Sequence, residues 1–381
     1  MKVRFWGVRG STPTSALENL RYGGNTPCIE IRTPDDRLFV FDCGTGFRLL
    51  GKQLLNEYGH KSIQAHIFLS HYHWDHIQGI SFFEPLYNPE NNFHFYSFIS
   101  HAGSVQNVIE GQMSDPYFPV NMNIMKARRN FREMDANPVE LDGMKVTALP
   151  LNHPQGCLGF RIEYDGHVVT YATDNEPGSP EHDRNVRLLA QGADLFIYDS
   201  QYTPLEYSNF KRGWGHSTWR EGVNIAKETG VKQFILFHHD PDHNDVFVDS
   251  ILGEARKIFP NSMASWEGLE IDLAAGQQNK SQEMIERRLG RRQQLEIPVR
   301  VVGTRPDGTV FEEVTCLENL SVRGGFFILE NDPDTNEPLQ VELHTSRDGT
   351  TLHKSMVSTR VTRNLAVEVG KKTKRGIGVS F

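Results

Sequence analysis

The stretch "SHYHWDHIQG", residues 70–79, places three histidines and one aspartate within six positions, directly after an apolar run that predicts a buried strand. Alternate residues that leave a strand end lie on the same side, so His71 and His73 can bind one ion. Asp75 and His76 begin the next turn and can bind a second ion. Nitrogen and carboxylate donors without thiolates favour zinc, with manganese or iron as alternatives.

Later segments of the chain repeat this pattern. Three further apolar runs each predict a strand that ends in a residue able to bind a metal ion. The stretch "LPLNHPQG" contains His153, "TYATDNEP" contains Asp174 and "ILFHHDPDH" contains His238.

The HxHxDH spacing, followed by these strand ends in this order, resembles the metallo-β-lactamase superfamily over roughly residues 1–275. The resemblance implies an αββα sandwich of four layers with a dinuclear site at one edge of its two sheets. Two cations at such a site lower the pKa of a bound water, so no Ser or Cys nucleophile is required. By position, one metal is assigned to His71, His73 and His153, the other to Asp75, His76 and His238, and the bridge to Asp174, with Asp75 also counted as catalytic.

Two assignments within this resemblance stay open. The last metal ligand is His238 or its neighbour His239, and alignment with the family's last strand favours His238. The other histidines nearby, His239 and His243, are then expected to support the site or to contact substrate. Asp42, in "FDCGTG", matches an early aspartate that supports the family's site, but a role as a turn residue explains it equally well.

A second motif narrows the branch of the superfamily. The segment "GWGHSTWREGVN" resembles the GHST segment of ribonuclease Z-type phosphodiesterases. The resemblance implies that His216, paired with Asp199, assists at the scissile phosphate, because an imidazole oriented by a carboxylate can donate a proton to the departing alkoxide. The alternative is that His216 belongs to the start of a helix capped by Ser217.

The pattern changes after the first 275 residues. A polar linker is expected over 276–285, and six short predicted strands within 286–381 suggest a small barrel. Within the first domain, 1–275, the aromatic and irregular segment 81–140 is expected to form an insertion over the site.

The barrel region contains a second set of motifs. Arg288-x-x-x-Arg292 precedes its first strand, "ENLSVRGG" supplies an (N)xSxxG motif, and "GIGVSF" closes the chain. Together these resemble the PilZ domain, a six-stranded barrel that binds cyclic di-GMP. Arginine pairs with phosphate in a bidentate manner and stacks on guanine, which fits this ligand. The resemblance assigns the ligand to Arg288 and Arg292, with Arg287 and Arg291 as alternates, and to Asn319, Ser321 and Gly324.

Charge and composition limit the partners. The net charge of the chain is -8, and residues 281–381 have 15 Lys and Arg against 14 Asp and Glu, which leaves -9 for residues 1–280. An acidic metal domain argues against long nucleic acid and favours a small phosphodiester such as a cyclic nucleotide. Apolar runs fall short of the ~20 residues of a membrane span, and the start does not resemble a signal peptide, so a cytoplasmic location is expected. The oligomeric state is left open, a dimer included.

The sequence therefore predicts a metal-dependent hydrolase, specifically a phosphodiesterase that uses metal-activated water and is regulated by cyclic di-GMP. One alternative is a thioester or lactone hydrolase of the same fold. Another is a cyclic di-GMP receptor whose metal domain is a scaffold without catalytic activity.

Overall fold

The computed structural model describes residues 1–135, 137–274, 293–304, 308–321, 324–330, 333, 338–346, 352–369 and 372–380. The chain divides into two compact units, Met1–Gln278 and Asn279–Phe381, and each is described by itself. Among the described residues, no helix combines the length and the apolar character needed to cross a membrane.

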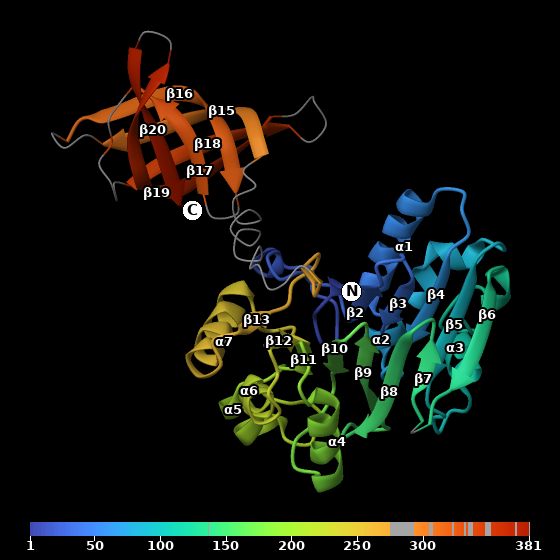
Figure 1. Ribbon diagram of the computed structural model, residues 1–381. Helices are drawn as coiled ribbons and strands as arrows, with labels where there is room; N and C mark the ends of the chain where they lie inside the picture. The colour runs from blue at the N-terminus through green and yellow to red at the C-terminus, as the bar shows by residue number, and fades with distance from the viewer. Residues whose placement is uncertain are drawn as a thin grey trace. The chain divides into compact units, whose positions relative to one another are not determined.

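The first unit contains two seven-stranded sheets (Figure 1). The first sheet has the order β14-β1-β2-β3-β4-β5-β6, in which β3 to β6 are parallel and the others antiparallel. Its strands are β1 (Lys2–Gly7), β2 (Cys28–Arg32), β3 (Leu38–Phe41), β4 (Gln64–Phe68), β5 (Asn92–Ser97), β6 (Arg128–Glu133) and β14 (Glu270–Asp272).

The second sheet has the order β13-β12-β11-β10-β9-β8-β7, with β10 to β13 parallel. It is built from β7 (Val139–Leu141), β8 (Met144–Leu151), β9 (Cys157–Tyr164), β10 (His167–Ala172), β11 (Leu195–Asp199), β12 (Gln233–Phe237) and β13 (Ser262–Ala264). Parallel strands align their carboxyl ends, so residues that follow several of them can meet at one edge.

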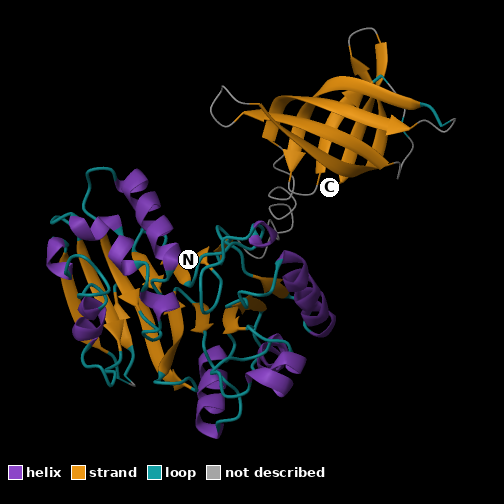
Figure 2. Cartoon of the chain, turned by 180° about the vertical axis from the view of Figure 1, so that it is seen from behind, coloured by secondary structure: helices purple, strands orange, loops and turns teal. Residues whose placement is uncertain are grey.

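Helices lie on the outer faces of both sheets, so the predicted four-layer αββα sandwich is confirmed (Figure 2). The α-helices are α1 (Thr45–Tyr58), α2 (Trp74–Ile77), α3 (Val105–Gly111), α4 (Pro180–Ala190), α5 (Pro204–Glu206), α6 (Trp219–Glu228) and α7 (Asp245–Ile258). Short helices of other types are η1 (Leu17–Asn19), η2 (Ile80–Phe82), η3 (Glu84–Tyr87), η4 (Met122–Ile124) and the π-helix η5 (Tyr207–Lys211).

Aromatic side chains join the two sheets at the centre of the sandwich. The ring of Phe41 on β3 lies 5.1 Å from that of Phe68 and 5.5 Å from that of Phe160 on β9. On the second sheet, Tyr171 and Phe237 are 5.6 Å apart. All five are fully or almost fully buried, and burying each ring contributes about 1.5–3 kcal/mol. This packing fixes the relative position of the strand ends that hold the site.

The prediction of an irregular insertion at 81–140 is wrong. That segment contains β5 and β6, which extend the first sheet in parallel with β4. The reason is visible in β6, "RRNFRE", an edge strand of which most residues are exposed. Phe131 is the only apolar residue of β6, so the strand lacks the alternation of apolar and polar residues by which a strand is recognised.

Strands of the second unit form a closed antiparallel barrel in the order β15-β16-β17-β20-β19-β18. They are β15 (Gln293–Thr304), β16 (Val310–Ser321), β17 (Gly324–Leu329), β18 (Pro338–Ser346), β19 (Leu352–Val369) and β20 (Lys372–Ser380). Apolar residues such as Val301, Phe327 and Ile377 are buried inside. The six strands predicted within 286–381 are each found among the described residues, but β19, with 18 residues, is much longer than the short strand expected there.

Candidate metal centre

The HxHxDH segment connects the end of β4 to the first turn of α2. His73 is the residue before the helix and has an extended backbone, whereas Asp75 and His76 lie within the helix. The change from extended to helical backbone turns the chain here, so the four side chains separate into two pairs. His71 and His73 take part in one group of neighbouring donor atoms, and Asp75 and His76 in another.

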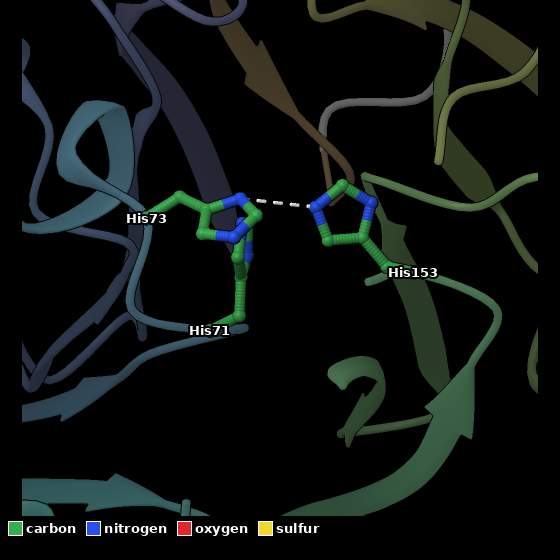
Figure 3. A group of neighbouring side chains, drawn as sticks. All are labelled: His71, His73 and His153. Atoms are coloured by element: carbon green, nitrogen blue, oxygen red, sulfur yellow. Dashed lines mark hydrogen bonds between the residues drawn. The ribbon is translucent and has the colours of Figure 1, made fainter. Parts of the chain in front are cut away.

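The first group consists of His71, His73 and His153, whose donor atoms all lie within 4.8 Å of one another (Figure 3). The closest pair is His153 Nε2 and His73 Nδ1, at 3.1 Å. His153 Nδ1 donates a hydrogen bond to the Gly215 carbonyl at 2.7 Å, so its Nε2 is free of hydrogen. Burial lowers the pKa of His153 to about 4, which keeps the imidazole neutral and able to bind a metal.

The second group consists of Asp75, His76 and His238. Asp75 Oδ2 lies 3.1 Å from His76 Nε2 and 3.3 Å from His238 Nε2, and the two Nε2 atoms are 3.2 Å apart. His238 Nδ1 donates to the Gln201 side-chain oxygen at 2.8 Å, which directs Nε2 at the group. Gln201, in "DSQY", was not among the residues predicted from the sequence.

Asp174 lies between the two groups. Its Oδ1 is 3.8 Å from the Nε2 atoms of His71 and His153, and its Oδ2 is 3.3 Å from His76 Nε2 and 3.4 Å from His238 Nε2. Burial disfavours the charged carboxylate, but the neighbouring imidazoles hold the pKa of Asp174 well below its usual range. One oxygen facing each group is the arrangement of a bridging ligand.

The donor set fits divalent cations. His71 Nε2 is buried and has no hydrogen-bond partner among the described residues, although buried polar atoms are ordinarily paired. Imidazole and carboxylate donors without thiolates suit zinc, manganese or iron. All seven residues assigned to two metals from the sequence therefore lie in this cluster.

Asp42, directly after β3, supports the cluster through hydrogen bonds. Its Oδ2 accepts hydrogen bonds from His76 Nδ1 at 2.8 Å, from the Tyr171 hydroxyl at 2.6 Å and from the Ser70 hydroxyl at 2.8 Å. Its Oδ1 accepts from the Ser70 backbone N–H at 2.7 Å. The residue also occupies a turn with φ of 60°, so the two alternatives for Asp42 both describe it.

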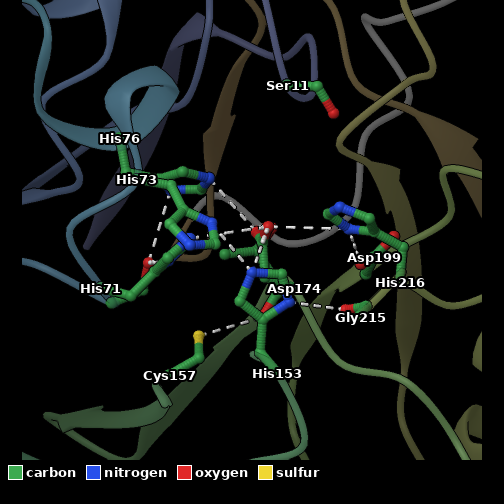
Figure 4. A network of polar contacts seen from close by, with 12 residues as sticks. Ser11, His71, His73, His76, His153, Cys157, Asp174, Asp199, Gly215 and His216 are labelled. Carbon is green, nitrogen blue, oxygen red and sulfur yellow. Dashed lines mark hydrogen bonds and ion pairs between the residues drawn. The ribbon is translucent and has the colours of Figure 1, made fainter. Parts of the chain in front are cut away.

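His216 and Asp199 meet beside Asp174 (Figure 4). His216 Nδ1 donates to Asp199 Oδ2 at 3.0 Å and lies 3.6 Å from Asp174 Oδ1. Burial lowers the pKa of His216, but attraction by Asp199 and its hydrogen bond outweigh burial and raise the pKa to about 9. The predicted cap of the following helix, Ser217, is wrong by one residue, because Thr218 accepts from the Glu221 N–H. Ser217 is instead held inward by the Tyr198 hydroxyl.

A cavity of about 460 Å³ opens onto the cluster. It is lined by Ser11, Tyr72, His73, Trp74, Asp75, Gln155, Asp174 and His216. The Ser11 backbone N–H donates to Asp75 Oδ2 at 2.8 Å, and Gln155 lies 3.3 Å from His73 Nε2. Ser11 and Gln155 come from loops distant in sequence, and no spacing pattern connects them to the motif.

His239 and His243 lie outside the cluster. His239 Nε2 donates to the Ser265 carbonyl at 2.9 Å, and burial, reinforced by Arg9, lowers the pKa of His239 to about 3. His243 pairs with Glu206 at 2.8 Å. Of the two candidates for the last ligand, the structure places His238 in the cluster, whereas His239 and His243 support neighbouring loops.

The residues predicted to bind cyclic di-GMP all fall within the second unit, Asn279–Phe381. Arg287, Arg288, Arg291 and Arg292 lie outside the described residues. Asn319 and Ser321 belong to β16 and Gly324 to β17, and the backbones of Ser321 and Gly324 are paired across the two strands.

The first unit matches known proteins. The sequence profile of the beta-lactamase superfamily domain matches residues 37–239, more than half of the chain. The chain belongs to this superfamily. A ribonuclease Z from Synechococcus sp. (strain CC9311) is 26% identical over 326 residues, which cover 72% of this chain and 99% of that protein.

Solved structures of the superfamily have the same fold. The metallo-beta-lactamase fold protein YhfI from Bacillus subtilis has a TM-score of 0.53 at 19% identity and covers 71% of this chain and 98% of its own. A diphosphatase from the PhnP family has a TM-score of 0.52 at 19% identity and covers 71% and 97%. Superfamily membership and the His/Asp cluster together support a metal-dependent hydrolase.

Proposed function

We propose that the chain is a phosphodiesterase in which two divalent metal ions, zinc first among them, bind the His/Asp cluster. The observation on which this rests is the His216–Asp199 pair, at 3.0 Å, on the wall of the cavity beside the bridging Asp174. A thiolate leaves a thioester without protonation, whereas the alkoxide expelled from a phosphodiester is more basic and is helped by a proton donor. The relatives named ribonuclease Z and the PhnP-family diphosphatase support the same branch.

Each residue has a distinct part in this proposal. Bound divalent cations would lower the pKa of a water molecule and stabilise the charge on the phosphate oxygens. Asp199 holds His216 Nδ1–H, so that Nε2 is left to donate a proton to the leaving oxygen. The Ser11 N–H fixes Asp75 at the cavity wall, and Asp42 and Gln201 fix the imidazoles of His76 and His238 behind it.

Hydrolysis of bis-p-nitrophenyl phosphate by zinc- or manganese-loaded protein tests the function. His216→Asn should lower kcat by about 10²–10⁴-fold while the metal content is retained. His182→Asn is the matched control, since His182 also forms a side-chain hydrogen bond, to Ser179, but lies on α4 and in none of the groups of donor atoms. A loaded wild type that cleaves thioesters or lactones and no phosphodiester would overturn the proposal.

We further propose that the natural substrate is a small phosphodiester, because the net charge of -9 over residues 1–280 opposes a long polyanion. Competition against bis-p-nitrophenyl phosphate by cyclic nucleotides and by structured RNA distinguishes the two. Stronger inhibition by structured RNA at physiological salt would reject the small substrate.

We also propose that the second unit is a PilZ domain that binds cyclic di-GMP and regulates hydrolysis. The strand register supports this, because Gln293 pairs with Leu320 and Gln294 with Asn319. The chain directly after Arg292 therefore runs beside the strand end that contains Asn319 and Ser321. A ligand contacting both motifs would meet them at this end of the barrel.

Calorimetry with cyclic di-GMP tests this part. Arg288→Ala combined with Arg292→Ala should abolish binding, since each guanidinium–phosphate pair contributes about 1.5–3 kcal/mol. The wild type should change its rate of bis-p-nitrophenyl phosphate hydrolysis when saturated with cyclic di-GMP. Verified binding with an unchanged rate would reject regulation, and two metals bound without any hydrolysis would favour a receptor with a non-catalytic scaffold.

A further inference from the structure

The segment before His216, residues 207–215, consists of the π-helix η5 (Tyr207–Lys211) and the short connection that follows it, and this segment is tied to the metal centre. Glu176 accepts hydrogen bonds from the backbone N–H groups of Gly213 at 2.6 Å and Gly215 at 2.8 Å. The Gly215 carbonyl in turn accepts from His153 Nδ1 at 2.7 Å. The backbone at Gly213 and Gly215 is therefore held in a fixed position relative to the cluster.

Lys211, the last residue of η5, is a cation held by aromatic rings. Its ammonium nitrogen lies 4.2 Å from the ring centroid of Trp214 and 5.3 Å from that of Tyr202. In the part of the chain that the structure describes, Lys211 forms no salt bridge with a carboxylate. Ring faces attract a cation without neutralising its charge, so this ammonium remains able to bind an anion.

Lys211 and His216, a member of the proposed catalytic pair, both contact the ring of Tyr202. Tyr202 is buried, and its ring lies edge-on to that of His216 at 5.8 Å. The distance from the ammonium nitrogen to the centroid of the His216 ring therefore cannot exceed the sum of the Lys211–Tyr202 and Tyr202–His216 distances. Trp214 is 58% exposed, so one face of a large aromatic ring next to this cation is open to a ligand.

We propose that Lys211 and Trp214 form a subsite for a nucleotide that has a second phosphate on the same sugar as the scissile one. The ammonium pairs with the second phosphate, and the exposed indole stacks on the base. This inference rests on the proposed phosphodiesterase function, because it assumes that the scissile phosphate occupies the metal centre. Lys211 is not among the residues that line the cavity at the cluster, so we assign the ammonium to a second phosphate and not to the scissile one, and the substrate class then has at least two phosphates.

Binding of two matched probes to the zinc-loaded full chain tests the subsite. We expect thymidine 3′,5′-bisphosphate to bind about tenfold more tightly than thymidine 5′-monophosphate, because only the former supplies a second charged acceptor. Either phosphate of the bisphosphate can occupy the metal centre, so the comparison does not depend on strand direction. Lys211→Met preserves the length of the side chain and should remove this difference, with the monophosphate affinity changed by less than about twofold.

Two further variants separate charge from stacking. Trp214→Leu should weaken both probes equally, by about fivefold or more, since stacking does not depend on the second phosphate. Arg220→Met is the control, because Arg220 is exposed and its guanidinium lies 5.6 Å from the Trp219 ring on α6. It should leave both affinities unchanged.

The outcomes distinguish the two proposals. Equal binding of the two probes by the wild type, or a difference that survives Lys211→Met, overturns the subsite. Wild-type turnover of bis-p-nitrophenyl phosphate, measured in parallel, reports on the phosphodiesterase. Binding that depends on Lys211 without any turnover would reject the hydrolysis and retain the subsite.

Discussion

Replacing Asp42 by asparagine should weaken the binding of one metal at the centre and leave the other unchanged. Asp42 Oδ2 accepts three hydrogen bonds, from His76, Tyr171 and Ser70. The asparagine amide has one acceptor oxygen and one donor nitrogen, so its nitrogen must face either His76 Nδ1 or the backbone N–H of Ser70, and both of these are donors. The hydroxyls of Tyr171 and Ser70 can rotate to accept, but His76 Nδ1 accepts only if its proton moves to Nε2, and a protonated Nε2 cannot bind a metal. Metal binding at His76 must therefore overcome a donor facing a donor, at Ser70 or at His76, or the wrong tautomer of His76.

Loss of such a partner behind a metal-bound histidine lowers affinity by about 10–100-fold, which corresponds to roughly 1.4–2.7 kcal/mol. Among the described residues, none of the three histidines of the first group forms a hydrogen bond with Asp42: His71, His73 and His153. The metal of this group should therefore remain bound. Zinc content measured against a graded chromogenic chelator should therefore show one site weakened and one unchanged.

Tyr171→Phe is the control for this prediction, because it removes one donor to Asp42 but leaves the acceptor for His76 Nδ1. Its zinc affinities should stay within about threefold of the wild type. Asp42→Asn protein that folds and retains both zinc ions at wild-type affinity would refute the tautomer argument.

Three further results are expected. Gly215→Ala should weaken metal binding at the first group, since φ there is +85° and a Cβ would lie 2.4 Å from His153 Nδ1. Gly213→Ala is the control, because φ is +87° there too but the space around it is open, and it should leave the zinc content unchanged. Chelator competition compares the two variants. Phe83→Ala should lower the free energy of unfolding by about 3–5 kcal/mol in urea titration, because it removes the ring stacked 3.7 Å from Phe47, and an unchanged midpoint would contradict this. Dialysis against a chelator should abolish phosphodiester hydrolysis and added zinc should restore it, so activity that persists without metal would contradict a metal mechanism.

The sequence was sufficient to bring together the residues predicted as metal ligands, because local spacing and strand order determine where they lie. His71 and Asp75 are close along the chain, and His153, Asp174 and His238 each follow a predicted strand. Carboxyl ends of parallel strands meet at one edge, so the order of the strands brings these residues together. The six barrel strands were predicted by the same alternation of apolar runs and turns.

Residues behind and around the ligands could not be predicted in this way. Gln201 and Gln155 contact His238 and His73 through folds of the chain that no short motif encodes. Lys211 differs from other surface lysines only in its ring neighbours, which are known only in three dimensions. Strand β6 was missed because its exposed, basic sequence resembles a loop.

Three residues of the centre have a left-handed backbone. Asp42, Asp174 and His238 have φ of 60°, 54° and 61°, a conformation that costs residues other than glycine on the order of 1 kcal/mol or more each. Relief of backbone strain alone would favour glycine at all three positions, and each replacement would delete a group that the centre requires. Screens for thermostable variants of this chain should therefore be run with metal present and turnover as the criterion, because selection on stability alone would favour variants that have lost their activity.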